Sequence, residues 1–92
     1  MNHSAAVAHL ASALERAGLL VERRGALPLR VAGITDDSRH VVKGGAFVAV
    51  RGTQRDGHDY LAAAAAAGAA MVIVEDASAT ALPALVVRHG RR

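Results

Sequence analysis

Two short polar segments of this sequence hold side chains suited to binding a ligand. The first, Asp36-Asp37-Ser38-Arg39, follows an apolar run, and the second, residues 52–57, follows the next apolar run and opens a helix-forming stretch. Ligands of open α/β sheets bind at the carboxyl ends of strands, and the positive end of a helix favours anions. The pattern therefore predicts a binding site built from both segments. It also leaves open that the first segment is only a turn and that Asp56 only caps a helix.

No combination of residues in the sequence predicts catalysis. The chain has no cysteine, and it lacks the Gly-x-x-x-x-Gly-Lys-[Ser/Thr] and Gly-x-Gly-x-x-Gly phosphate motifs as well as His-Glu-x-x-His and Gly-x-Ser-x-Gly. Ser38, His58 and Asp37 have no spacing typical of a triad, and the adjacent Asp36 and Asp37 would point to opposite faces of a strand. We therefore assign no catalytic, cofactor-binding or metal-binding residue to this chain.

The hydrophobic pattern predicts an α/β sandwich around these segments. Ala46–Val50 and Met71–Val74 are continuous apolar runs typical of strands covered on both faces, and the alanine-rich stretch between them predicts a crossover helix and a parallel strand pair. Further strands are expected over 19–21, 29–35 and 85–87. Helices are expected from an N-cap at Ser4 to Gly18, with Val7, Leu10, Leu14 and Ala17 as its apolar stripe, and over 60–67, ending at Gly68.

Composition limits the class of protein further. The chain has 92 residues, 52% of them hydrophobic, and a net charge of +3. It is long enough for a single domain, 1–92. Arg88, Arg91 and Arg92 account for the whole net charge as a basic tail, 88–92, so the body is neutral. Because the only aromatic residues are Phe47 and Tyr60, we expect no nucleic-acid binding. We expect no membrane segment or signal peptide, and hence a cytoplasmic protein.

Four stretches of the sequence form a combination of motifs: GITDDSRHV (33–41), GAFVAVRG (45–52), DGHDY (56–60) and residues 65–75. Taken together they resemble the amino-terminal domain of the Mur ligases, the ATP-dependent enzymes that add amino acids or a dipeptide to UDP-N-acetylmuramic acid in peptidoglycan synthesis. The resemblance covers roughly Leu29 to Val87. Within the family the sequence is most similar to the ligase that adds the third peptide residue, and the ligase that adds D-alanyl-D-alanine is the alternative.

The resemblance implies a fold and a substrate. The fold is a small three-layer α/β sandwich with a mixed, mainly parallel sheet and flanking helices, and the chain ends before the last helix of that domain. The partner is UDP-N-acetylmuramoyl-peptide, whose UDP end would be held by Ser38, Asp36, Thr53, Gln54 and Arg55. Relatives commonly have an apolar residue at the position of Asp36, so its contribution would come mainly from backbone and packing.

The resemblance also assigns other tasks to other parts. Asp37 and Arg39 suit structural roles, as a carboxylate that fixes the turn and as its ion-pair partner. ATP and Mg²⁺ belong to family domains that this sequence does not contain, so we expect a binding module without ligase activity of its own, whose partners include those missing domains. A structural module that docks onto another protein without binding a nucleotide sugar remains the alternative.

Overall fold

A mixed five-stranded sheet forms the centre of the molecule. The computed structural model describes residues 5–49, 57–75 and 80–88 of the chain. Along the sheet the strands follow the order β2-β7-β6-β5-β4; the three pairs formed by β4, β5, β6 and β7 are parallel, and only β2 runs antiparallel, beside β7. The strands are β2 (Leu20–Arg24), β4 (Ile34–Thr35), β5 (Ala46–Ala49), β6 (Met71–Val74) and β7 (Ala84–Val87).

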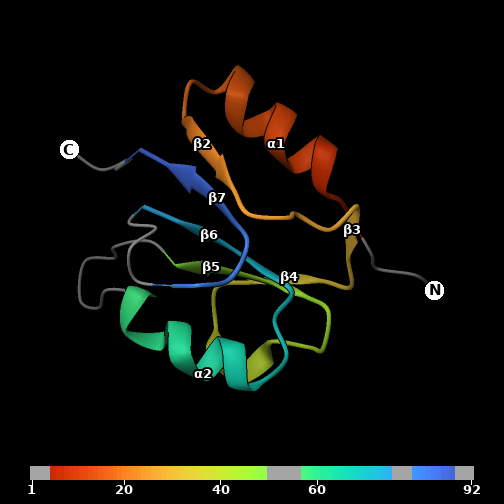
Figure 1. The fold of residues 1–92 in the computed structure, drawn as a ribbon, viewed down its shortest axis with the longest axis vertical. Coiled ribbons are helices and arrows are strands. Elements are labelled where there is room, and N and C mark those ends of the chain that lie inside the picture. Colours follow the sequence, from red (N-terminus) through yellow and green to blue (C-terminus); the bar gives the residue numbers. More distant parts are fainter. Residues whose placement is uncertain (1–4, 50–56, 76–79, 89–92) are drawn as a thin grey trace.

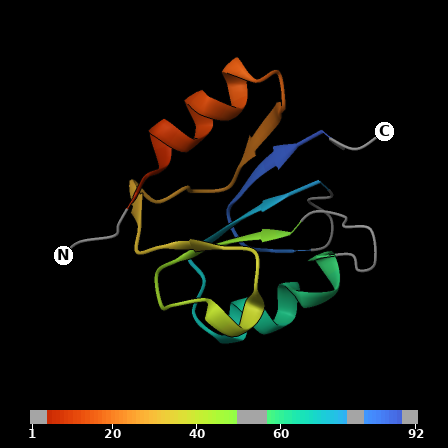
Figure 2. The same cartoon turned by 180° about the vertical axis from the view of Figure 1, so that it is seen from behind.

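Helices cover both faces of this sheet. Helix α1 (Val7–Arg16) lies on one face and α2 (Leu61–Ala66) on the other (Figure 1). Two 3₁₀ turns, η1 (Ser38–His40) and η2 (Gly57–Tyr60), contact α2, and Figure 2 shows η1 beside that helix. A separate two-stranded sheet joins β1 (Ala5–Ala6) to β3 (Arg30–Val31). The predicted three-layer sandwich with a mainly parallel sheet is therefore confirmed.

The continuous apolar runs of the sequence supply two cores at once. Successive strand residues point to opposite faces of a sheet, so alternate members of each run enter different clusters. On the α2 face the buried residues include Phe47, Ala49, Val72, Val74 and Val86. On the α1 face they include Val31, Met71, Ile73, Leu85 and Val87. The prediction that the two runs are strands covered on both faces is confirmed over Ala46–Ala49 and Met71–Val74, while Val50 lies outside the described residues.

Both helices end as predicted, at a glycine. Gly18 (φ +73°) and Gly68 (φ +99°) have the left-handed backbone that glycine adopts without a Cβ clash. The amide of the following residue then bonds back to the helix, Leu19 N to Leu14 O at 2.9 Å and Ala69 N to Ala64 O at 3.1 Å. Each end is thus a Schellman motif, which satisfies carbonyl groups that the helix leaves unpaired.

The start of each helix differs from the prediction. Ser4 and Asp56, the predicted caps, lie outside the described residues. The amide of Val7 instead donates to the carbonyl of Leu29 at 2.9 Å, so a distant segment replaces a side-chain cap. Helix α2 begins at Leu61, one residue later than predicted, because the 3₁₀ turn η2 precedes it.

Two further details correct the predicted pattern. The stretch 29–35 is divided into β3 and β4, because Val31 pairs with β1 while Ile34 and Thr35 pair with β5. On α1, Ala17 is exposed and Ala11 takes its place among the buried residues, since the helix ends at Arg16. The strand expected over 19–21 extends to Arg24, where β2 is held by β7.

Candidate functional site

The two predicted binding segments leave the sheet from neighbouring parallel strands. The first follows Thr35 at the end of β4, and the second follows β5, whose last residue is Ala49. The register pairs Thr35 with Phe47, two residues before that end. Because β4 and β5 are adjacent and parallel, both segments start at the same edge of the sheet, where α/β proteins bind ligands.

Local hydrogen bonds fix the backbone of the first segment. The amide of Asp37 donates to the Thr35 hydroxyl at 3.1 Å. The carboxylate of Asp37 caps η1 by accepting from the amide of Arg39 at 2.9 Å, and the amide of His40 donates to the carbonyl of Asp37 at 2.9 Å. Short polar side chains commonly fix turns in this way. Residues 35–40 therefore form a turn of defined shape.

Asp37 and Arg39 form a bidentate ion pair on this turn. The Arg39 Nε and Nη2 donate to the two carboxylate oxygens at 3.0 and 2.8 Å. The hydrogen bonds from the Arg39 side chain, followed by the one from its amide, hold the pKa of Asp37 far below its usual range. The same bond, and to a smaller degree the nearby Tyr60 of η2, raise the pKa of Arg39. The structural roles predicted for this pair are confirmed.

Asp36 directly precedes this ion pair in the sequence, and Ser38 lies between its two members. Ser38 is the half-buried first residue of η1, and its hydroxyl takes part in none of the bonds that fix the turn. Asp36 is exposed directly after β4. Thr53, Gln54 and Arg55, the other predicted site residues, lie outside the described residues, so their placement beside Ser38 stays a prediction.

The charges of the described half of the site favour an uncharged ligand group. Arg39 is neutralised by Asp37, and Asp36 adds a negative charge beside them. A phosphate would therefore meet no unpaired cation on residues 35–39. The six-residue α2 begins only after η2, so a 3₁₀ turn precedes the helix start that was predicted to attract an anion.

A hydrogen bond that the sequence pattern did not predict lies at the same edge. The amide of Glu75, directly after β6, donates to Nε2 of His58 in η2 at 3.2 Å. His58 belongs to the Asp-Gly-His motif, and the sequence pattern assigns it no contact. The only available signal was the position of that motif after a buried strand, because a bond between residues 17 apart depends on the register of β5 and β6.

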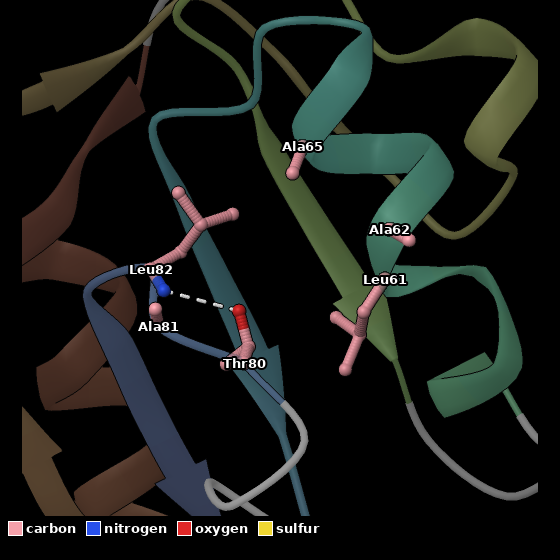
Figure 3. Close-up of a pocket in the computed structure, with 6 residues that line it drawn as sticks. All are labelled: Leu61, Ala62, Ala65, Thr80, Ala81 and Leu82. Carbon is pink, nitrogen blue, oxygen red and sulfur yellow. Dashed lines mark hydrogen bonds between the residues drawn. The ribbon is translucent and has the colours of Figure 1, made fainter.

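A shallow apolar groove on the α2 face lies apart from these residues. It has a volume of about 320 Å³. Figure 3 shows Leu61, Ala62 and Ala65 of α2 on one side and Thr80, Ala81 and Leu82, which precede β7, on the other. The amide of Leu82 donates to the Thr80 hydroxyl at 3.1 Å, which is the dashed line in the figure. Neither Asp36 nor Ser38 lines this groove.

The described ranges contain no group of three or more His, Asp or Glu side chains placed to hold a metal ion. Within the same part of the chain, no helix is long and apolar enough to cross a bilayer.

The fold defines a small α/β domain with a mainly parallel sheet and a polar turn directly after β4. Comparison with known proteins identifies the family. Residues 30–89 match the model described as "Mur ligase family, catalytic domain", which is more than half of the chain. The chain belongs to the Mur ligase family, and it matches the amino-terminal domain of these ligases.

Sequence relatives and solved structures agree on this family. The chain is 49% identical over 57 residues to the UDP-N-acetylmuramoyl-L-alanyl-D-glutamate--2,6-diaminopimelate ligase of Geobacter metallireducens, covering 62% of this chain and 11% of that protein. The corresponding ligase of Chlorobaculum tepidum is 49% identical over 61 residues, covering 64% of this chain and 12% of that protein. A crystal structure of MurF from Acinetobacter baumannii superposes with a TM-score of 0.59 at 36% identity, covering 63% of this chain and 13% of that one.

The chain thus spans about an eighth of the length of the proteins it matches. The family model carries the word catalytic in its description, yet the sequence has no glycine-rich Gly-Lys-[Ser/Thr] loop for ATP. The described residues also offer no acidic cluster for Mg²⁺. These residues do not fit an ATP–Mg²⁺ site, and no step through those groups is assigned to this chain.

Proposed function

We propose that this chain is the substrate-binding domain of a Mur ligase of peptidoglycan synthesis and that it holds the UDP end of UDP-N-acetylmuramoyl-peptide. Ser38 and Asp36 would provide one side of the site, and Thr53, Gln54 and Arg55 the other. The observation that carries the proposal is the start of both polar segments from the adjacent parallel strands β4 and β5 at one edge of the sheet.

The chemistry of the described half suits the nucleoside better than the phosphates. Uracil and ribose are uncharged and present hydrogen-bond donors and acceptors, which a serine hydroxyl can both accept from and donate to. Because Arg39 is already paired with Asp37, the diphosphate would need another cation. Arg55 would supply that charge on the second segment.

The relatives support a narrower assignment within the family. The relatives from Geobacter metallireducens and Chlorobaculum tepidum are named as 2,6-diaminopimelate ligases. This favours the ligase that adds the third peptide residue. The MurF structures support the alternative, the D-alanyl-D-alanine-adding ligase, at 36% identity. ATP and Mg²⁺ would act in further domains, which are also the expected partners of this one, and the whole enzyme would work in the cytoplasm.

A titration of the complete chain with UDP, followed by nuclear magnetic resonance, tests the proposal. We expect shifts at Ser38 and Gln54, smaller shifts with CDP, and weaker binding for Ser38→Ala. The loss of one neutral hydrogen bond, about 0.5–1.5 kcal/mol, corresponds to a dissociation constant about 2- to 12-fold higher. Ser12→Ala is the matched control, because Ser12 is exposed on α1, which covers the opposite face.

Two results would contradict this assignment. Unchanged signals of Ser38 and Gln54 up to millimolar UDP would exclude autonomous nucleotide binding. If the chain does not bind UDP and its melting temperature rises with protein concentration, the alternative of a docking module would be favoured instead.

A further inference from the structure

We propose that His58 is a positioning residue, which locks the stem of the connection between β5 and α2 by accepting a hydrogen bond from the amide of Glu75. The inference goes beyond nucleotide binding, because it assigns a task to a side chain that contacts the backbone of another strand. Only its consequence for UDP affinity rests on the proposed function.

The sheet register brings the two ends of this connection together. Ala49, the last residue of β5, pairs with Val74, the last residue of β6. Glu75 follows Val74 directly, and its amide lies 3.2 Å from Nε2 of His58, in the turn that leads into α2. The chain therefore leaves the sheet beside Val74 and returns beside Glu75. The two ends of the connection thus lie beside Val74, the last residue of β6, and Glu75, the residue directly after it.

The chemistry of the bond requires an acceptor at the position of Nε2. A neutral imidazole provides one when its proton is on Nδ1. His58 is half-buried, which shields this bond from water. Tyr60, at the other end of η2, packs against the buried cluster on the α2 face. Hence η2 is held to the core by Tyr60 and to the sheet edge by His58.

A locked stem would matter for binding because it limits the conformations of the connection that carries Thr53, Gln54 and Arg55. If only a fraction of molecules has the competent arrangement, the apparent affinity falls by that fraction. Releasing one end should therefore weaken UDP binding without changing any of the residues predicted to hold UDP.

Two substitutions in the complete chain separate the effect of the hydrogen bond from the effect of side-chain size. His58→Phe keeps an aromatic ring and removes the acceptor, whereas His58→Gln places an amide oxygen where Nε2 was. We expect His58→Phe to speed hydrogen exchange at the Glu75 amide by about 2- to 12-fold, the factor for one ordinary hydrogen bond, and His58→Gln to restore slow exchange. His9→Phe, at an exposed position of α1, is the matched control.

The ligand arm uses UDP and the same variants. We expect His58→Phe to weaken UDP binding by a similar factor and His58→Gln to restore it. In the wild type, ¹⁵N spectroscopy should show the His58 imidazole protonated at Nδ1. Unchanged exchange at Glu75 in His58→Phe would overturn the lock. Faster exchange with unchanged UDP affinity would overturn its effect on binding. If the wild type does not bind UDP, the proposed function is wrong. The exchange data at Glu75 still test whether His58 holds this connection.

Discussion

Replacing Gly68 by alanine should destabilise the domain more than the same change at Gly18, although both glycines hold the same position after a helix. At both, the left-handed backbone costs a non-glycine residue about 1–2 kcal/mol. Alanine recovers about 0.4–1 kcal/mol, because it restricts the unfolded chain. We therefore expect Gly18→Ala to lower the free energy of unfolding by at most about 1.5 kcal/mol.

The surroundings of the two glycines differ. A Cβ at Gly18 would meet no atom within 4 Å, whereas one at Gly68 would lie 3.1 Å from Cα of Lys43 and 3.3 Å from its Cβ. A backbone atom cannot move aside as a flexible side-chain end can. The neighbouring bonds also hold this contact in place, since the Gly44 amide donates to the Gly68 carbonyl at 2.8 Å and the Ala70 amide to the Gly45 carbonyl at 2.8 Å.

We expect this crowding to add about 1–3 kcal/mol to the cost of Gly68→Ala, as for other overpacked sites. The total free energy of unfolding for a chain of this size is about 5–14 kcal/mol. The extra loss would lower the melting temperature by about 4–8 °C per kcal/mol. Urea unfolding of the wild type and the two variants measures the difference. Equal free energies for Gly18→Ala and Gly68→Ala would refute the role assigned to the contact with Lys43.

Two further predictions concern the packing and the charges. Ala64 is fully buried on α2, so Ala64→Val should lower the free energy of unfolding by about 1–3 kcal/mol. Ala63→Val, on the exposed side of the same helix, should lower it by only about 0.5 kcal/mol. Equal losses of the two variants in chemical denaturation would contradict the buried contact of Ala64. The lowered pKa of Asp37 means that its ion pair stabilises the fold above the ordinary value of 3.8 and that this stabilisation is lost as the pH falls below it. The stability difference between wild type and Asp37→Asn should therefore shrink from pH 7 to pH 2, and a constant difference would exclude that linkage.

The sequence predicts those elements whose signals are local. The apolar runs of β5 and β6 are long enough to be buried on both faces, and each helix ends at a glycine that its own last turn requires. The pairing of Asp37 with Arg39 is also local, because the two residues are only two positions apart. Their roles could be predicted before the fold was known.

Features that depend on the register of distant strands could not be predicted in this way. Nothing near Leu29 indicates that its carbonyl accepts the first amide of α1, and nothing near His58 indicates that Glu75 lies opposite. The division of 29–35 has the same origin, since the stretch serves two different sheets. The family resemblance, in contrast, names the predicted site residues, but it does not indicate which hydrogen bonds fix the turn that contains Ser38.

One buried cluster connects the two halves of the proposed site. Val41, which follows η1, and Tyr60, which ends η2, both pack against the cluster on the α2 face that contains Phe47. The α1 face has a separate cluster, and neither of the described site residues, Asp36 and Ser38, belongs to it. Because each turn rests on the same buried side chains, their relative position is set by the packing of one face. The packing of the α2 face would thus set the geometry of the proposed site, whereas β2 completes the sheet and α1 covers its other face.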